Sequence, residues 1–114
     1  MKKDSLVFIK HIWDFIISIE NYTLNKTKKD FLMNEMMQDA IFRKIEIIGE
    51  AVKNLPFNFT DKYSTVPWKD IAGMRDKLIH HYFGVDLNKV WNVVKMDIPP
   101  LKKEIKKILE EHKN

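Results

Sequence analysis

Residues 37–55 read MQDAIFRKIEIIGEAVKNL, and the apolar side chains in this stretch recur every three or four positions. Such spacing places them on one face of an α-helix. The pattern predicts one long amphipathic helix over residues 30–54, the longest element in the chain, which Pro56 stops. The positions that form its predicted apolar face are Met37, Ile41, Ile45, Ile48, Val52 and Leu55.

Upstream of this helix, residues 4–20 have the pattern of another helix, which begins at a cap formed by Asp4 or Ser5. Its apolar face is broad and consists of Leu6, Ile9, Trp13, Ile16 and Ile17. Residues 21–29 are polar and are expected to connect the two helices.

Downstream, residues 56–66 are expected to form a loop that contains a short turn around residues 61–64. Pro67 suits the first position of a helix, where its missing N–H costs nothing. The sequence predicts that this third helix extends to residue 83, with Gly84 as a left-handed cap and Gly73 as the candidate for a bend.

The final predicted helix has to pass Pro99 and Pro100. Its apolar positions keep an alternating spacing of four and three residues on both sides of the prolines: Leu87, Trp91, Val94, Ile98, Leu101, Ile105 and Ile108. A new helix capped by Asp97 would normally reset this phase, so the pattern favours one kinked helix over two separate ones.

No segment has the pattern of a β-strand, so the expected fold class is all-α. We expect an up-and-down bundle of four main helices, and a short fifth helix stays open. The 114 residues include 45% hydrophobic residues, three glycines and four prolines, and they are expected to form a single domain over residues 1–114.

The composition narrows the class of protein. The chain carries 20 Lys and Arg against 16 Asp and Glu, a net charge of +4 that is compatible with a polyanionic partner, although its lysine clusters at residues 26–29 and 102–107 are more typical of solvated surfaces. The absence of cysteine excludes disulfides and thiolate metal sites and fits a reducing compartment. No stretch has the roughly 18 consecutive apolar residues of a membrane span, and no secretory signal is recognised. We therefore expect a soluble, cytoplasmic protein.

The segment Arg75-Asp76-Lys77-Leu78-Ile79-His80-His81-Tyr82 combines residue types that suit cleavage of a phosphodiester without a metal. The guanidinium of Arg75 can hold a phosphate with two parallel hydrogen bonds and stays charged at any working pH. The imidazole of His80 has an ordinary pKa of about 6.5 and can transfer protons near neutrality. The hydroxyl of Tyr82, with an ordinary pKa of about 10, is a poor unaided base.

One regular helix would not gather these three side chains. On an ideal helix Arg75 and Tyr82 lie only about 20° apart around the axis, whereas His80 lies about 140° from Arg75. Convergence needs a local bend, the reach of the arginine, or a second copy of the chain across a two-fold axis.

The chain resembles the HEPN superfamily and, within it, the HepT-like ribonuclease toxins, whose signature is R-x4-H-x-Y. Arg75, His80 and Tyr82 match the signature, and Asp76 matches the polar residue that usually follows the arginine. Further matches lie at residues 48–52 (IGEAV), 67–74 (PWKDIAGM), 83–86 (FGVD) and 90–91 (VW). The resemblance covers most of the chain.

This resemblance implies a homodimer whose paired signature segments line a shared cleft, which makes dimerisation a requirement for activity. It also implies transesterification, in which the 2′-hydroxyl of RNA attacks the neighbouring phosphorus and leaves a cyclic phosphate. His80 would act as general base or acid, Arg75 would stabilise charge on the non-bridging oxygens and Tyr82 would orient the phosphate. Asp76 and His81 are candidate assisting residues. No metal or cofactor is expected, and tRNA and mRNA both stay open as the RNA target.

The resemblance also supplies a partner. Chains of this type are typically encoded beside an MntA-type nucleotidyltransferase antitoxin, which neutralises the toxin by attaching a nucleotide (AMPylation) to the signature tyrosine. Tyr82 is the expected acceptor in this chain. A bulky anionic adduct there would block RNA and oppose the charge of Arg75.

Other polar and aromatic residues have structural interpretations. His11 and Asp14 share a helix face but are too few for a metal site. Glu46 and Glu50 lie one turn apart and are expected to pair with lysines of a neighbouring helix, with Glu50 a weak candidate for a place near the site. Large apolar side chains expected in the core or at dimer contacts are Trp13, Trp68, Trp91, Met33, Met36 and Met37.

Three functional hypotheses remain open on the sequence alone. The chain is a ribonuclease toxin, a noncatalytic module that binds RNA or nucleotide beside a nucleotidyltransferase, or a structural dimer whose signature segment is only an interface. The presence of Arg75, His80 and Tyr82 together favours the ribonuclease, because a binding platform needs no proton-transfer group beside its arginine.

Overall fold

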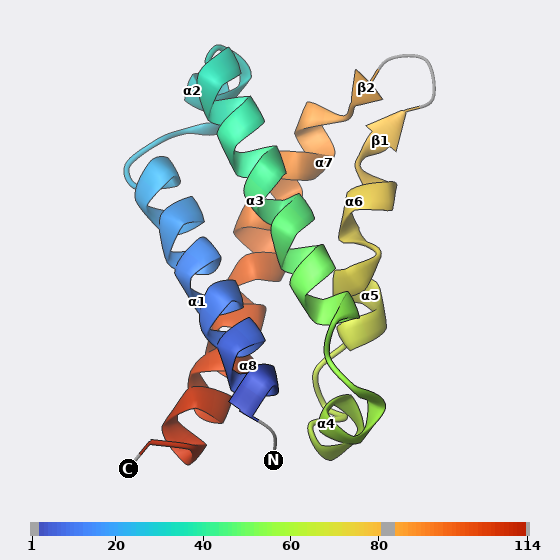
Figure 1. Ribbon diagram of the computed structural model, residues 1–114. Helices are drawn as coiled ribbons and strands as arrows, with labels where there is room; N and C mark the ends of the chain where they lie inside the picture. Colours follow the sequence, from blue (N-terminus) through green and yellow to red (C-terminus); the bar gives the residue numbers. More distant parts are fainter. Residues whose placement is uncertain (1–2, 81–83, 114) are drawn as a thin grey trace.

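The computed structural model describes residues 3–80 and 84–113. It confirms the all-α class, because helices form the bundle and the strands are two residues long each (Figure 1). None of the helices in these two ranges combines the length and apolar character needed to cross a membrane. The elements in chain order are α1 (Lys3–Thr23), α2 (Lys28–Leu32), α3 (Glu35–Lys53), α4 (Phe57–Lys62), α5 (Trp68–Ala72), α6 (Met74–Lys77), β1 (Ile79–His80), β2 (Gly84–Val85), α7 (Leu87–Asn92), the π-helical segment η1 (Val93–Asp97) and α8 (Ile98–Glu111).

Helix α3 is central to the bundle. It packs against α1 on one side and against α5 and α6 on the other, while α8 packs against α1 (Figure 1). The predicted apolar face of α3 is confirmed, since Met37 is partly buried and the other members of the face are buried: Ile41, Ile45, Ile48, Val52 and Leu55. Burial of this face against two neighbours is the main source of stability for the helix.

Helix α1 follows its prediction in the middle and exceeds it at both ends, because it already includes Asp4 and Ser5, which were predicted to form its cap. Its fully buried face consists of Ile9, Ile12, Ile16 and Ile19. Trp13 and Ile17, which were also predicted for this face, lie partly buried at its edges. The helix continues past Glu20 to Thr23, whose hydroxyl donates a hydrogen bond to the carbonyl of Ile19 at 2.9 Å.

The prediction of one helix over residues 30–54 is wrong at its start, because two helices occupy this stretch. The side chain of Asn34 accepts a hydrogen bond from the N–H of Met37 at 3.0 Å and caps α3. The preceding α2 has its own capping box, in which Thr27 and Asp30 each accept the other's backbone N–H. Because both helices turn an apolar face to one core, the spacing of apolar residues did not reveal the break.

Residues 56–66 contain a short helix, α4, rather than only the predicted turn at residues 61–64. Phe59 anchors it, since its buried ring lies 5.0 Å from the ring of Tyr63 and 6.1 Å from that of Trp68. The indole N–H of Trp68 donates to the carbonyl of Tyr63 at 3.0 Å. Pro67 is the cap of α5 and not its first helical residue, so this boundary lies one position from the prediction.

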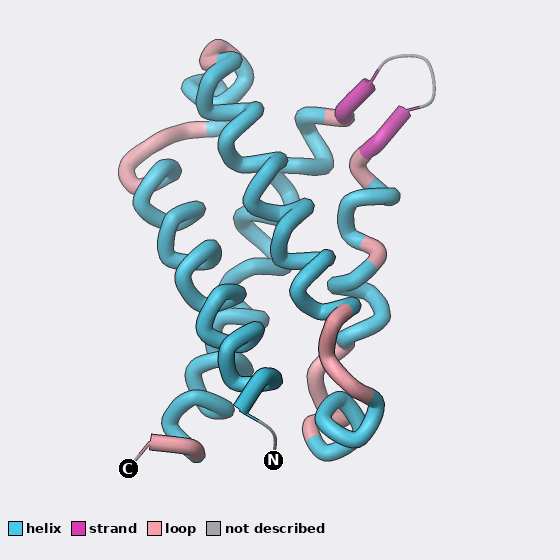
Figure 2. The backbone as a smooth tube through the Cα atoms, viewed as in Figure 1, coloured by secondary structure: helices cyan, strands magenta, loops and turns pink. Residues whose placement is uncertain are grey.

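The prediction of a single helix over residues 67–83 is also wrong. The helix is interrupted after Ala72, resumes as α6 and ends at Lys77. Ile79–His80 then pair with Gly84–Val85 as an antiparallel ribbon (Figure 2), so the expectation that the chain contains no strand is corrected.

A hydrogen bond to the returning chain helps to end α6. The carbonyl of Leu78 accepts from the N–H of Asp86 at 2.7 Å, so that this carbonyl is satisfied by the hairpin instead of by another helical turn. The predicted bend at Gly73 is present as the junction between α5 and α6. Gly84 has the predicted positive φ, 75°, but it belongs to the hairpin and not to a helix cap.

The final helix passes its prolines without a break, as the spacing predicted. The segment η1 widens the turn before them, where the N–H of Ile98 donates to the carbonyl of Val93, five residues back. Pro99 and Pro100 then lie in the first turn of α8, where an N–H is not needed. Asp97 makes no side-chain capping bond in the described structure, which disfavours a separately capped helix.

Candidate functional site

Arg75 lies on the four-residue helix α6, which the core holds in place. Met74, which directly precedes Arg75, and Leu78, about one turn after it, are only 5% and 1% exposed. The Arg75 side chain is 43% exposed, so its guanidinium is accessible to a ligand while its backbone is anchored.

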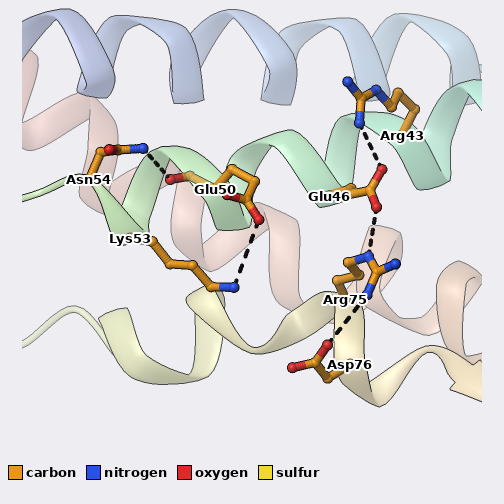
Figure 3. A network of polar contacts seen from close by, with 7 residues as sticks. All are labelled: Arg43, Glu46, Glu50, Lys53, Asn54, Arg75 and Asp76. Atoms are coloured by element: carbon orange, nitrogen blue, oxygen red, sulfur yellow. Dashed lines mark hydrogen bonds and ion pairs between the residues drawn. The ribbon is translucent and has the colours of Figure 1, made fainter.

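A carboxylate from the central helix holds this guanidinium. The Nε of Arg75 donates to Glu46 Oε2 at 2.6 Å, and the other carboxylate oxygen of Glu46 accepts from Arg43 at 2.9 Å (Figure 3). One carboxylate therefore bridges two arginines, one from its own helix and one from α6. The hydrogen bond to Glu46 therefore comes from the Nε of Arg75 and not from either of its two terminal nitrogens.

These contacts favour the charged forms of both partners. The hydrogen bond from Arg75, followed by that from Arg43, lowers the pKa of Glu46 below its ordinary value of 4.5. The hydrogen bond to Glu46 raises the pKa of Arg75 above its ordinary value. The pair is therefore ionised at any pH at which the protein would work.

Glu46 is the residue at this site that sequence reasoning placed wrongly. It pairs with arginines and not with a lysine of a neighbouring helix, and Glu50 approaches Lys53 of its own helix at 3.8 Å. The signal was Gly49, where an added Cβ would lie only 3.3 Å from the carbonyl oxygen of Ala72. The small residue lets α5 come close to α3 and so brings Arg75 beside Glu46.

Asp76 also lies beside the arginine. Its carboxylate is 3.6 Å from Nη1 of Arg75, and its side chain is 77% exposed. At this exposure the ion pair contributes little to stability, because water screens it. Asp76 is therefore positioned to influence the charge around Arg75, whereas its predicted assisting role stays a prediction.

Of the other predicted residues, His80 belongs to strand β1. The structure describes the backbone of His80, which pairs with Gly84, and not the position of its side chain. His81 and Tyr82 lie outside the described residues. The predicted angle of about 140° between Arg75 and His80 assumed one helix. That assumption fails, because Arg75 is on a helix and His80 is on a strand.

His11 and Asp14 are both exposed on α1, far along the chain from this network. Trp68 and Trp91 are buried core residues. Met33 and Met36, which were expected in the core or at dimer contacts, are 78% and 84% exposed and so do not belong to the core. The exposed pair lies at the junction of α2 and α3.

Comparisons with known proteins agree on one family. The family model described as "Ribonuclease HepT-like" matches residues 12–108. A Thermococcus cleftensis protein named "Probable ribonuclease HepT" is 44% identical over 108 residues, which cover 95% of this chain and 98% of that protein.

A second relative is longer than this chain. A Methanocaldococcus jannaschii protein named "Gamma-glutamylcyclotransferase and putative RNase" is 56% identical over 111 residues, which cover 97% of this chain and 50% of that protein. The chain therefore spans half the length of this relative. No solved structure matches the chain. Because the family model extends over most of the sequence and the Thermococcus protein matches from end to end, the chain belongs to the HepT-like ribonuclease family.

Proposed function

We propose that this protein is an endoribonuclease that cleaves RNA with Arg75, His80 and Tyr82. The observation that carries the proposal is the state of Arg75: it is ionised, partly exposed, anchored by buried neighbours and followed five residues later by a histidine, within a chain of the HepT-like family. A guanidinium in this state can bind a phosphate and stabilise the additional charge of a transition state.

The reaction is a transesterification. The 2′-hydroxyl oxygen attacks the adjacent phosphorus, the bond from phosphorus to the 5′-oxygen breaks, and the products are a 2′,3′-cyclic phosphate and a 5′-hydroxyl. His80 accepts the proton of the 2′-hydroxyl or donates one to the leaving oxygen. Arg75 stabilises the negative charge on the non-bridging oxygens, and Tyr82 orients the phosphate by a hydrogen bond. Asp76 and His81 assist by contacting the substrate or tuning the imidazole.

The active species is a homodimer. Two copies related by a two-fold axis bring their signature segments together and form one cleft for RNA. The short α6 and the hairpin that follows it are suited to this arrangement, because they lie on the side of α3 opposite to α1 (Figure 1).

The protein acts as the toxin of a toxin–antitoxin pair in the cytoplasm. Its antitoxin is an MntA-type nucleotidyltransferase, which transfers a nucleoside monophosphate from a nucleoside triphosphate to the Tyr82 hydroxyl and releases pyrophosphate. The added negative charge opposes the binding of RNA beside Arg75 and blocks the cleft.

Purified protein tests the enzymatic part of this proposal. The wild type, Arg75→Ala and His80→Ala are incubated with total RNA in the presence of a chelator, and the fragment ends are identified by mass spectrometry. The wild type is expected to give cyclic phosphate ends. His80→Ala is expected to lose about 100-fold or more of the rate and still bind RNA, because it lacks only the proton-transfer group.

The same experiment separates the alternatives. A wild type that binds RNA but cleaves none, with His80→Ala binding equally well, would indicate a noncatalytic RNA-binding module. A substrate with a single 2′-deoxyribose at the cleaved position is the matched control and is expected to resist cleavage there.

A further inference from the structure

We infer that Glu46 is a positioning residue of the active site, which orients Arg75 by binding its Nε and so directs the terminal nitrogens of the guanidinium toward the scissile phosphate. This inference rests on the proposed ribonuclease function. It adds a fourth residue, from a different helix, to the three of the signature.

The choice of nitrogen is the first observation. A carboxylate bound to both terminal nitrogens would occupy the edge that binds phosphate. Glu46 instead accepts from Nε at 2.6 Å (Figure 3). The guanidinium is planar, so holding Nε fixes the plane and direction of the two terminal nitrogens.

Glu46 is itself held firmly enough to orient a partner. It lies in the middle of α3 beside Ile45, which is fully buried, and its second oxygen is bound by Arg43 at 2.9 Å. With one oxygen on each arginine, the carboxylate has little freedom to rotate. Its own side chain is 21% exposed, about half as much as the 43% of Arg75.

A purely structural role explains the arrangement less well. An ion pair with this much exposure adds little to stability, and α6 is already anchored by Met74 and Leu78, which are 5% and 1% exposed. A catalytic arginine gains more from fixed geometry, because misplacement by about 1 Å can cost 100-fold in rate. The lowered pKa of Glu46 agrees with a fixed anion and not with a proton carrier.

The variant Glu46→Gln tests this inference, and Glu50→Gln is its control. Both remove one negative charge from α3 that acts on Arg75, but Glu46 also hydrogen-bonds the guanidinium, whereas Glu50 faces Lys53 at 3.8 Å. Glu46→Gln is expected to lower kcat by about 10- to 100-fold with little change in KM, because the contact it weakens orients the group that stabilises the transition state. Glu50→Gln should stay within about twofold of the wild type. Circular dichroism would confirm that both variants fold.

A double-mutant cycle shows whether Glu46 acts through Arg75. A lysine at position 75 has no Nε–H for Glu46 to hold. In the Arg75→Lys background, Glu46→Gln is therefore expected to have little further effect on kcat. An equal loss in both backgrounds, or a loss confined to KM, would overturn the positioning role. So would a Glu46→Gln variant as active as Glu50→Gln.

A chemical readout distinguishes failure of this inference from failure of the proposed function. Phenylglyoxal modifies arginine, and mass spectrometry measures the reaction at Arg75 whether or not RNA is cleaved. We expect Arg75 to react several-fold faster in Glu46→Gln than in Glu50→Gln, because its guanidinium is released. Unchanged labelling would refute the positioning contact, whereas a wild type that cleaves no RNA refutes the ribonuclease proposal and, with it, any catalytic role for Glu46.

Discussion

The contact between Arg75 and Glu46 joins residues 29 positions apart and makes the charge of each partner depend on the other. Arg75 lowers the pKa of Glu46 below its ordinary value of 4.5, so the carboxylate is more acidic in the folded protein than in the unfolded chain. Folding therefore gains free energy from this carboxylate above its unfolded pKa, and the gain is lost as pH falls through the lower folded pKa.

This sign predicts how stability depends on pH. The wild type is expected to be slightly more stable than Glu46→Gln at neutral pH, and the difference is expected to shrink as pH falls below the ordinary pKa of 4.5 and through the lower folded pKa of Glu46. Urea unfolding across this range measures the free energy of unfolding of each protein. A difference that stays constant with pH would show that the carboxylate gains nothing from its arginines.

At the scale of elements, the position of the site depends on how closely α5 approaches α3. Gly49 leaves little room for a side chain, since a Cβ there would meet the carbonyl oxygens of Ala72 and Ile71 at the tight distances of 3.3 and 3.4 Å. These neighbours are backbone atoms and cannot move aside without shifting the helix that leads to α6.

Substitution of this glycine tests the close approach. Gly49→Ala is expected to reduce the free energy of unfolding by about 1–3 kcal/mol through overpacking and to lower RNA cleavage by moving Arg75 away from Glu46. Gly73→Ala is the matched control, because a Cβ there would lie at ordinary contact distances of 3.5 and 3.9 Å. Equal effects of the two substitutions would argue against the packing explanation.

The hairpin requires a left-handed backbone conformation at Gly84. Its φ of 75° lies in the left-handed region, while a Cβ would meet no atom of the described residues within 4 Å, so among them the backbone conformation is what opposes a side chain. Gly84→Ala is expected to lose about 1–2 kcal/mol in urea unfolding, and Gly84→Asn to lose less, because asparagine tolerates this region better. An alanine variant as stable as the wild type would indicate that the glycine is not held there.

At the scale of the whole molecule, the proposed shared cleft of a homodimer predicts complementation between inactive variants. Arg75→Ala and His80→Ala are each expected to be inactive, whereas a mixture allowed to exchange subunits should regain about a quarter of wild-type activity. Half of the dimers would then be mixed. Each mixed dimer would carry one intact pair, with Arg75 from one copy and His80 from the other, out of the two such pairs that line the cleft. Size-exclusion chromatography would confirm the dimers. A mixture as inactive as its components would contradict a site built from both copies.

Several features of this bundle could be predicted because they depend on neighbours in the sequence. The burial of Ile41, Ile45 and Ile48 follows from helical periodicity, which a helix face imposes on any chain. Continuity through Pro99 and Pro100 was visible in the unbroken spacing of apolar residues. The residue types of the signature likewise belong to one short segment, which lies within the residues that the family model matches, while their roles stay a prediction.

Other features depended on contacts that local patterns do not encode. The predicted apolar face was drawn from Met37 onward, so its periodicity could not show the split between α2 and α3, although the Asn34 cap was a local signal. The end of α6 depends partly on the N–H of Asp86, which returns from beyond the hairpin to the carbonyl of Leu78. Residues 79–80 were read as helix from the sequence, but they form a strand because the returning chain pairs with them.

The amino-acid sequence by itself determined the all-α class, the apolar faces and the residues of the signature, because each of these is written in composition or in spacing along the chain. Only the tertiary structure decided that Arg75 lies on a short helix ahead of a strand and that Glu46 holds its guanidinium. The physical reason is that a carboxylate and an arginine distant in sequence meet only when their two helices pack closely enough. Here the close packing depends on Gly49, which has no side chain.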